Sequence, residues 1–443
     1  MVRSSPLEPS PGWGCLAMDK VRVVVTGLGV VAPNGHGLDA FASALREGKS
    51  GIQFHQHLAD ANFGCRVGGI PEDIEGLRRG YLTEEESMAM NANMVYAAVA
   101  AIDAWSDAGL QRPPADSNEV DWDSGAVMGT GIGGMDTIAE KLIPKTDAGK
   151  VSRLGSTMVE QIMSSGNSAR LAGMFGLGNQ VTTNSSACNT GTEAVVDAFL
   201  RIREGRALRM IAGGSEGHSK YIWAGFDAMK VLCRTHNDAP SKASRPMSAS
   251  AAGFVPGSGA GALVLESLES ADRRGARIYA EVLGGFVNCG GHRMGGSMTA
   301  PNPHGVQKCI REAVSMAGIR PESIGAINGH LTATSADPTE VANWARALEL
   351  PRERMPLLHS TKSLIGHALG AAGGIECVAS VLELHHGFVH GSLNCEDLHP
   401  SIAPYGTSIP HATVDRPDLA VIAKASFGFG DVNGCVIFRK FAH

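Results

Sequence analysis

Short apolar segments alternate with longer helical patterns along almost the whole chain. Segments rich in β-branched and aliphatic residues predict strands, and stretches with apolar residues at helical spacing predict helices. The predicted strands are 21–26, 126–128, 180–183, 209–212, 262–265, 278–283, 324–327, 357–359, 419–423 and 435–438, and the predicted helices are 88–108, 189–204, 306–317 and one from about 371. This alternation favours a layered α/β fold.

A junction at Gly275-Ala276 divides these elements into two series. At roughly 150 residues per domain the length alone suggests about three domains. The junction divides the chain after the N-terminal residues into two stretches, 19–275 and 276–443. Residues 1–18 are rich in Pro, Ser and Gly and lack the apolar stretch of a signal peptide, so they are expected to be a disordered extension or a cloning remnant.

Composition excludes several classes of protein. The hydrophobic fraction of 43% argues against a disordered chain, and the formal charge of −6 argues against nucleic-acid binding. No apolar run reaches the ~18 residues that a membrane-spanning helix needs. The nine cysteines are scattered and form no CxxC pair, which disfavours both a disulfide scaffold and a zinc ribbon. A cytoplasmic protein is therefore expected.

Glycine is unusually frequent, with 56 residues in 443. Segments 27–32 and 129–134 each fit the dinucleotide fingerprint G-x-G-x-x-G/A after a predicted strand. The first is followed by Pro33-Asn34-Gly35, which would break the required helix, and the residues about 20 positions beyond the end of each motif, Gln53 and 150–157, are not acidic. A nicotinamide or flavin site is therefore disfavoured, and these glycines are expected to permit tight turns between strand and helix.

A small-residue segment, 184–194, joins a predicted strand to a predicted helix and contains Cys188. The positive end of a helix dipole lowers the pKa of a nearby thiol, so Cys188 is expected to favour the thiolate and to act as a nucleophile. The alternative is a buried, inert cysteine, which is the commoner fate of this residue type.

Three later segments carry further chemistry. Segment 328–334 contains His330, segment 360–374 contains Lys362 and His367, and segment 426–434 contains two phenylalanines spaced by glycine, a flexible loop or a hairpin turn. With 16 histidines in the chain, any single one is more often structural. A cysteine nucleophile with two histidines suggests acyl-thioester chemistry, in which a thiolate takes an acyl group and histidines stabilise a developing anion. No HExxH motif or paired Cys/His spacing points to a metal.

In this order and with these gaps, the four segments resemble the β-ketoacyl-acyl-carrier-protein synthases, condensing enzymes of the thiolase-like superfamily. The resemblance covers about residues 21–440, and segments 23–29, 244–246 and 257–262 also match signatures of that family. It implies a thiolase-like α/β fold of two similar halves in five α-β-α-β-α layers. It also implies a homodimer.

The reaction implied by the resemblance is a decarboxylative Claisen condensation of an acyl group with malonyl-carrier protein. Cys188 would accept the acyl chain from the phosphopantetheine of an acyl carrier protein. His330 and His367 would assist decarboxylation of the malonyl thioester and stabilise the enolate. Lys362 would organise this network with Glu376 as its acidic partner. No further cofactor is implied, because loss of carbon dioxide drives formation of the carbon–carbon bond.

The resemblance also implies binding and gating roles. The backbone N–H groups of Cys188 and Phe429 would form an oxyanion hole, and Phe429 would also act as a gate. The other implied residues are Ile132, which would limit the depth of the acyl pocket, Thr332 and Thr334, which would contact phosphopantetheine, Phe427, which would contact substrate, and Lys230, which would dock the carrier protein.

Two positions depart from the family pattern. Leu331 replaces a usual glycine and is expected to narrow the site entrance, and Asp431-Val432 replaces a common Gly-Thr. The second carrier-docking region is acidic, at residues 84–86, where basic residues are usual.

Two other hypotheses stay open. One is a non-catalytic or chain-length-determining partner subunit, which typically lacks the nucleophile. The other is a thiolase, which would use a second cysteine in place of one histidine.

Overall fold

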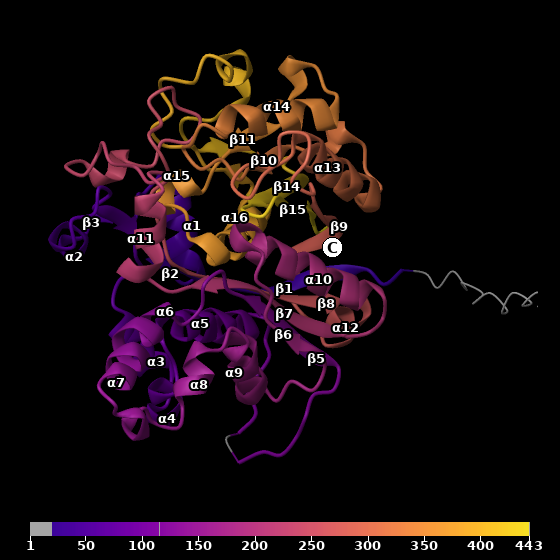
Figure 1. Cartoon of the computed structure of the whole chain (residues 1–443). Coiled ribbons are helices and arrows are strands. Elements are labelled where there is room, and N and C mark those ends of the chain that lie inside the picture. The colour runs from indigo at the N-terminus through magenta and orange to yellow at the C-terminus, as the bar shows by residue number, and fades with distance from the viewer. Residues whose placement is uncertain (1–19, 115, 443) are drawn as a thin grey trace, which may run out of the picture.

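A computed structural model describes residues 20–114 and 116–442 of the chain, so the predicted extension at 1–18 lies outside the described residues. An eleven-stranded sheet runs through the whole molecule (Figure 1). Its order is β11-β10-β14-β15-β9-β1-β8-β7-β5-β6, with β2 paired to β1. The two chain halves therefore share one hydrogen-bonded sheet.

Each half of the chain contributes one side of this sheet. The first half supplies β1 (Val23–Ala32), β2 (Gly35–His36), β5 (Ser124–Gly129), β6 (Val181–Thr182), β7 (Arg209–Glu216) and β8 (Gly259–Ser267). The second half supplies β9 (Ala280–Cys289), β10 (Ala326–Asn328), β11 (Leu357–His359), β14 (Val421–Gly428) and β15 (Val432–Lys440). The two sides meet where β1 pairs antiparallel with β9, for example Val23 with Val282.

Helices cover the sheet in three layers. In the middle, α10 (Thr190–Arg203) and α16 (Ala372–His386) pack against strands of both halves. On one outer side α5 (Ala92–Asp107) packs on β1, β7 and β8, and on the other α13 (Pro303–Ala317) packs on β9 and β15 beside α14 (Asp337–Leu348). Three large apolar clusters fill the spaces between these layers. Because α10 and α16 contact β7 and β8 of the first half and β14 and β15 of the second, the two sides of the sheet lie in separate layers, which gives the expected five-layer α-β-α-β-α arrangement.

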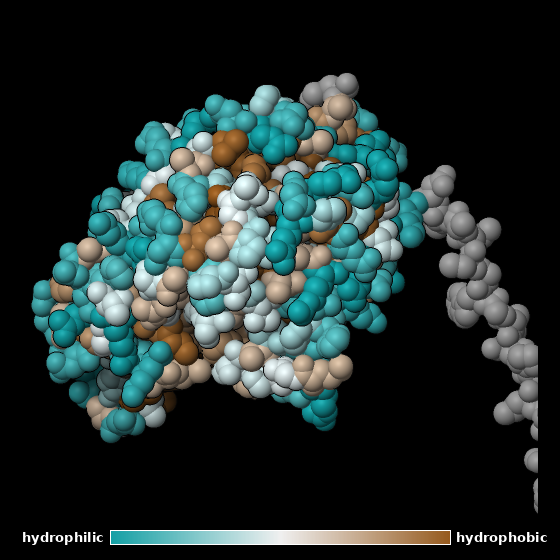
Figure 2. Space-filling view, turned by 90° about the horizontal axis from the view of Figure 1, so that it is seen from above, coloured by the Kyte–Doolittle hydropathy of each residue, from teal (hydrophilic) through white to brown (hydrophobic). Residues whose placement is uncertain are grey.

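Shorter elements complete the chain. They are α1 (Leu38–Glu47), α2 (Gln56–Asp60), α3 (Ile74–Tyr81), α4 (Glu84–Met88), α6 (Met135–Thr137), α7 (Ile143–Asp147), α8 (Met158–Ile162), α9 (Gly166–Phe175), α11 (Lys220–Ala228), α12 (Leu268–Arg273), α15 (Lys362–Ile365) and the two-stranded sheets β3 (Ile52–Phe54) with β4 (Val67–Gly69) and β12 (Phe388–Val389) with β13 (Val414–Asp415). Within the described ranges no helix is long and apolar enough to cross a membrane. The face in Figure 2 is mostly hydrophilic, with small separate apolar patches.

The glycines at 27 and 29 do not form the turn expected from the sequence. Both lie inside β1, which continues to Ala32. A Cβ on Gly27 would lie 2.1 Å from the carbonyl oxygen of Ala104, and one on Gly29 would lie 1.9 Å from that of Ala100. These glycines are therefore explained by the direct contact of α5 with the β1 backbone.

A second set of glycines brings backbones together at the centre of the molecule. A Cβ on Gly191 in α10 would lie 2.3 Å from the nitrogen of Gly374 in α16. One on Gly213 would lie 2.0 Å from the oxygen of Gly261, and one on Gly214 2.3 Å from the oxygen of Gly370. We call these contacts the glycine seam. It sets how closely α10 approaches α16, how closely β7 approaches β8, and how closely the turn before α16 approaches β7.

Candidate active site

Cys188 lies in a single 3-10 turn, Ala187–Asn189, that leads directly into α10. The hairpin of β14 and β15 presses against this turn. A Cβ on Gly428 would come within 3.0 Å of the Ser186 oxygen and 3.1 Å of the Cys188 nitrogen. Glycine at 428 therefore allows the hairpin to reach the thiol. Of the two predictions for this segment, a flexible loop or a hairpin turn, the structure has the hairpin turn.

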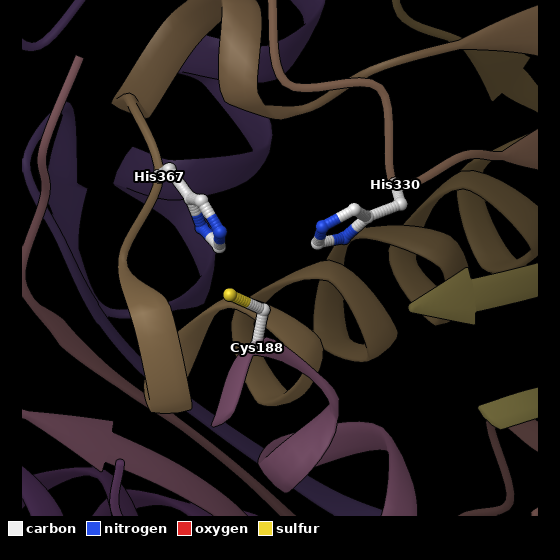
Figure 3. Close-up of side chains that lie close together, drawn as sticks. All are labelled: Cys188, His330 and His367. Carbon is white, nitrogen blue, oxygen red and sulfur yellow. The ribbon is translucent and has the colours of Figure 1, made fainter. Parts of the chain in front are cut away.

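Three side chains from separate elements converge on one point (Figure 3). Cys188 approaches from the start of α10, His330 from the segment after β10, and His367 from the segment after α15. Their sulfur and ring nitrogens include atoms that all lie within 4.8 Å of one another. The two imidazole rings are 5.3 Å apart between centroids and nearly perpendicular, at 85°. The sequence predicted these three residues but could not place them relative to each other.

The expected lowering of the Cys188 pKa is wrong. Burial raises the pKa of the thiol to about 11, although the positive charge of Lys362 and a hydrogen bond from the backbone N–H of Phe429 act in the opposite direction. The free-energy cost of burying a thiolate here is larger than the stabilisation of that thiolate by Lys362, by the Phe429 N–H and by the start of the helix. The resting sulfur is therefore a thiol at neutral pH.

Both histidines are neutral. Burial, and the nearby charge of Lys362, hold the pKa of His330 and of His367 well below the ordinary value. The backbone N–H of Leu369 donates to Nδ1 of His367 at 3.3 Å, so the proton of this ring sits on Nε2. Nδ1 of His330 is buried and has no hydrogen-bond partner among the described residues. His367 can thus donate a hydrogen bond to an oxygen in the site.

A buried carboxylate between two lysines lies behind these groups. Lys362 donates to Oε1 of Glu376, and Nζ of Lys424 lies 2.9 Å from Oε2 of the same carboxylate. All three side chains are at most 1% exposed. Sequence reasoning predicted the first two residues and missed Lys424, which sits in β14 without any motif of its own.

Two acidic residues that the sequence did not single out hold the segment around His330. Glu340 in α14 accepts the backbone N–H groups of His330 at 2.6 Å and Leu331 at 2.7 Å. Asp337 accepts that of Thr332 at 2.9 Å. Both belong to the first turn of α14, next to Pro338. In the sequence, a proline beside acidic residues indicates the start of a helix, and this pattern could have drawn attention to Asp337 and Glu340.

A cavity of about 690 Å³ opens onto Cys188, His330 and His367. The other predicted residues that line it are Thr332, Thr334, Phe427 and Phe429. Lys362 and Glu376 are buried behind the wall, and Ile132 lies outside it with 37% of its surface exposed. Lys230 is exposed between the lining residues Met229 and Val231.

Leu331 does not narrow the entrance, contrary to the expectation from the sequence. Its side chain is fully buried in the apolar cluster formed with Ile327 and Met247, and it does not line the cavity. The hydrogen bond from its backbone N–H to Glu340 fixes this orientation. The leucine therefore adds to the core of the second half.

A second cluster of metal-ligand type lies deeper in the protein. His359, Glu383 and His390 are all fully buried, with ligand atoms within 4.8 Å of one another. Nδ1 of His390 bonds to the carbonyl of Gly391 at 2.9 Å, and its Nε2 lies 3.1 Å from Nδ1 of His359. Since a carbonyl only accepts, the proton of His390 is on Nδ1, and its Nε2 accepts from His359. We call these three residues the relay: the two imidazoles are hydrogen-bonded to each other, and Oε2 of Glu383 lies 3.3 Å from Nε2 of His359 without a hydrogen bond between them.

The cavity is lined by a thiol and two neutral imidazoles, and the scaffold has two halves in five layers. Together these features define a condensing enzyme of the thiolase-like fold. The comparison with known families makes this specific. The models of the N-terminal and C-terminal domains of beta-ketoacyl synthases match residues 20–271 and 279–396. The chain belongs to the beta-ketoacyl synthase family.

Individual relatives agree with this assignment. The 3-oxoacyl-[acyl-carrier-protein] synthase 2 of Vibrio harveyi is 36% identical over 433 residues, which covers 96% of this chain and all of the relative. A chain of the ishigamide ketosynthase/chain length factor superposes with a TM-score of 0.84 at 29% identity, over 96% of this chain and 100% of that one. A type II polyketide ketosynthase, solved with its acyl-carrier protein and bound to the hexaketide, gives 0.83 at 28% over the same shares.

Proposed function

We propose that this chain is a 3-oxoacyl-[acyl-carrier-protein] synthase that elongates a fatty-acid or specialised polyketide-like chain. The observation that carries the proposal is the meeting of Cys188, His330 and His367 at one end of the cavity, in a chain that matches such synthases over nearly its full length. The substrates are acyl and malonyl thioesters held on the phosphopantetheine of a carrier protein, and the chemistry requires no separate cofactor.

The first half-reaction transfers the acyl group to Cys188. The sulfur attacks the thioester carbonyl, the carbon–sulfur bond to phosphopantetheine breaks, and the thiol proton leaves with the departing sulfur. The backbone N–H of Phe429 already points at the Cys188 sulfur, which supports its role in stabilising the oxyanion of this step.

The second half-reaction forms the new carbon–carbon bond. The malonyl thioester loses carbon dioxide, and the electron pair of the broken bond gives an enolate. Hydrogen bonds from the neutral histidines, including Nε2–H of His367, stabilise the enolate oxygen more than the uncharged thioester. The enolate attacks the acyl-cysteine, the sulfur of Cys188 leaves as a thiolate, and a proton from water restores the resting thiol. Lys362 and Glu376 act from behind the cavity wall as positioning residues.

The partners follow from the same proposal. The carrier protein would approach near the exposed Lys230, and a second copy of the chain would complete a homodimer, as is typical of the family. Every cysteine in the described part of the chain is a free thiol, which supports a cytoplasmic location.

Acyl loading tests the proposal directly. Incubation with an acyl-carrier thioester should add the mass of one acyl group to the protein, and Cys188→Ala should abolish that addition. Cys289→Ser is the matched control because Cys289 is an exposed thiol outside the cavity lining and a serine hydroxyl keeps its contacts with the backbone of Gly430 and Gly291, so this variant should still load. Acylation that persists in Cys188→Ala would show that the nucleophile is assigned wrongly.

A condensation assay separates the catalytic reading from that of a partner subunit. The loaded protein should release carbon dioxide from malonyl-carrier protein and form a 3-oxoacyl product without help. Product that appears only after a second ketosynthase-like chain is added would instead favour a subunit of a heterodimer. Retention of Cys188 supports the catalytic reading.

A further inference from the structure

Asp431 occupies the tight turn of the β14–β15 hairpin, two residues after Phe429. Its φ is +60°, a conformation that non-glycine residues other than Asn and Asp rarely adopt. Its side chain is fully buried. A strained, buried carboxylate needs compensating contacts to persist.

Both hydrogen bonds of the carboxylate go to one segment, residues 290–302, which we call the rim loop. Oδ1 of Asp431 accepts the backbone N–H of Asn302 at 2.7 Å, and Oδ2 accepts that of His292 at 3.0 Å. The backbone oxygen of Asp431 accepts the N–H of Gly290 at 2.9 Å. Asp431 therefore bonds to both the start and the end of the loop, which the side chain of Asn302 also joins directly through the oxygen of Gly290 at 3.0 Å.

The rest of the hairpin turn adds to this attachment. The N–H of Gly430 donates to the oxygen of Met298 at 2.8 Å, and Nε2 of His292 donates to the oxygen of Gly430 at 3.0 Å. A Cβ on Gly296 would lie 2.5 Å from Oδ2 of Asp431, so the loop backbone packs directly on the carboxylate.

Little apolar packing is available to replace these bonds. Met294 and Met298 are 68% and 62% exposed, and His292 and Met294 both have positive φ. The rim loop nevertheless forms part of the cavity wall through Gly295, Thr299 and its neighbours Ala300 and Pro301. The position of this wall thus depends on polar contacts with the hairpin.

We propose that Asp431 is a positioning residue that latches the rim loop to the Phe429 hairpin and so fixes the width of the cavity entrance. The latch consists of the hydrogen bonds of Asp431, to which those of Gly430 and His292 add. Only its effect on substrate binding depends on the proposed synthase function.

Limited proteolysis tests the latch without any need for activity. Trypsin should cleave after Arg293, an exposed residue of the rim loop, at least about tenfold faster in Asp431→Gly than in the unaltered protein, because both charge-assisted hydrogen bonds are lost. Glycine fits the positive φ, so the hairpin itself should fold. Asp431→Asn should be intermediate, since its amide keeps one acceptor oxygen.

Asp73→Gly is the matched control. Asp73 also has positive φ, at +51°, and its carboxylate also accepts a backbone N–H, but that N–H belongs to Gly76 and not to the rim loop. This variant should leave cleavage after Arg293 unchanged. Equal cleavage rates in Asp431→Gly and the unaltered protein would overturn the proposal.

Alkylation of Cys188 measures the entrance. The ratio of its reaction rates with a bulky maleimide and with iodoacetamide, followed by peptide mass mapping, should rise in Asp431→Gly, and an unchanged ratio would refute the effect on width. In the synthase assay the KM for carrier thioester should rise more than kcat falls, with partial rescue in Asp431→Asn. Failure of the unaltered protein to load acyl groups would count against the proposed function and leave the proteolysis result standing.

Discussion

Two lysines share one carboxylate in the fully buried region behind the cavity. Lys362 and Lys424 contact opposite oxygens of Glu376, so the group carries two positive charges and one negative charge. Removal of one member of a buried ion pair leaves an uncompensated charge, which costs more than the pair itself contributes. The arrangement therefore depends on Glu376.

Glu376→Gln should lower the free energy of unfolding by about 3–5 kcal/mol, because two buried ammonium groups would then face each other without a counter-charge. Adding Lys424→Met to this variant should recover roughly half of the loss. Urea unfolding of the single and double variants measures both values. A double variant less stable than Glu376→Gln would contradict this explanation of how Glu376 stabilises the two lysines.

The relay of Glu383, His359 and His390 should make stability depend on pH. Burial raises the pKa of Glu383 to about 7 and lowers the pKa of His359 to about 3. Oε2 of Glu383 lies 3.3 Å from Nε2 of His359, whose proton is on Nδ1. A protonated Glu383 can donate a hydrogen bond to this nitrogen. An ionised Glu383 cannot, because the lone pairs of its oxygen and of the His359 nitrogen would repel each other.

The native state therefore holds the Glu383 proton more tightly than the unfolded chain does. The contribution of protonated Glu383 to the free energy of unfolding is fully present below the pKa of the unfolded chain, near 4.5, and is lost as pH rises through about 7. Glu383→Gln, a permanent donor, should be more stable than the unaltered protein at pH 8, by up to about 3 kcal/mol, and show little gain at pH 4. Thermal unfolding at both pH values tests this, and an equal gain at both would exclude the titration of Glu383 as its cause.

At the scale of elements, α5 lies unusually close to β1 because two glycines of the strand have no side chain. Gly29→Ala should force the strand and helix apart and lower the free energy of unfolding by about 1–3 kcal/mol or more. Gly173→Ala, inside α9 with nothing within 4 Å of the new Cβ, should instead add up to about 1 kcal/mol. Denaturant midpoints of the two variants should move in opposite directions, and a shift of both in the same direction would contradict the packing argument.

Local patterns predicted the elements better than their contacts. The strand at 357–359 is found at the predicted residues, and α10 and α13 begin and end within a few residues of their predicted bounds. The glycines of β1 were misread because a glycine beside a strand looks the same in sequence whether it makes a turn or receives a helix. Only the packing of α5 distinguishes the two cases.

The same limit applies to the site. Cys188, His330 and His367 stand in recognisable segments, so the sequence could name them. Lys424 and Glu340 act through contacts made across the fold, and the burial that raises the pKa of Cys188 also comes from distant segments. Neither long-range contacts nor desolvation leave a periodic trace in sequence.

Across the whole molecule, the two halves share both a sheet and a core. The central cluster combines residues of β1 and α10 with residues of α16 and β15. We expect a single unfolding transition, with a ratio of calorimetric to van't Hoff enthalpy of about 1 at fixed protein concentration. A separate 276–443 fragment should remain unfolded. Two resolved transitions, or a folded fragment, would show that the halves are independent domains.

The glycine seam has a consequence for how new substrate ranges could be selected in this scaffold. Any side chain at Gly191, Gly213 or Gly214 would overlap backbone atoms that cannot be repacked. Substitutions that reshape the centre of the molecule should therefore be excluded both in evolution and in laboratory libraries. Tolerated substitutions should instead accumulate in the cavity wall, around Phe226 and the rim loop. The residues that determine the product would then lie in a different part of the chain from those that keep the chemistry constant.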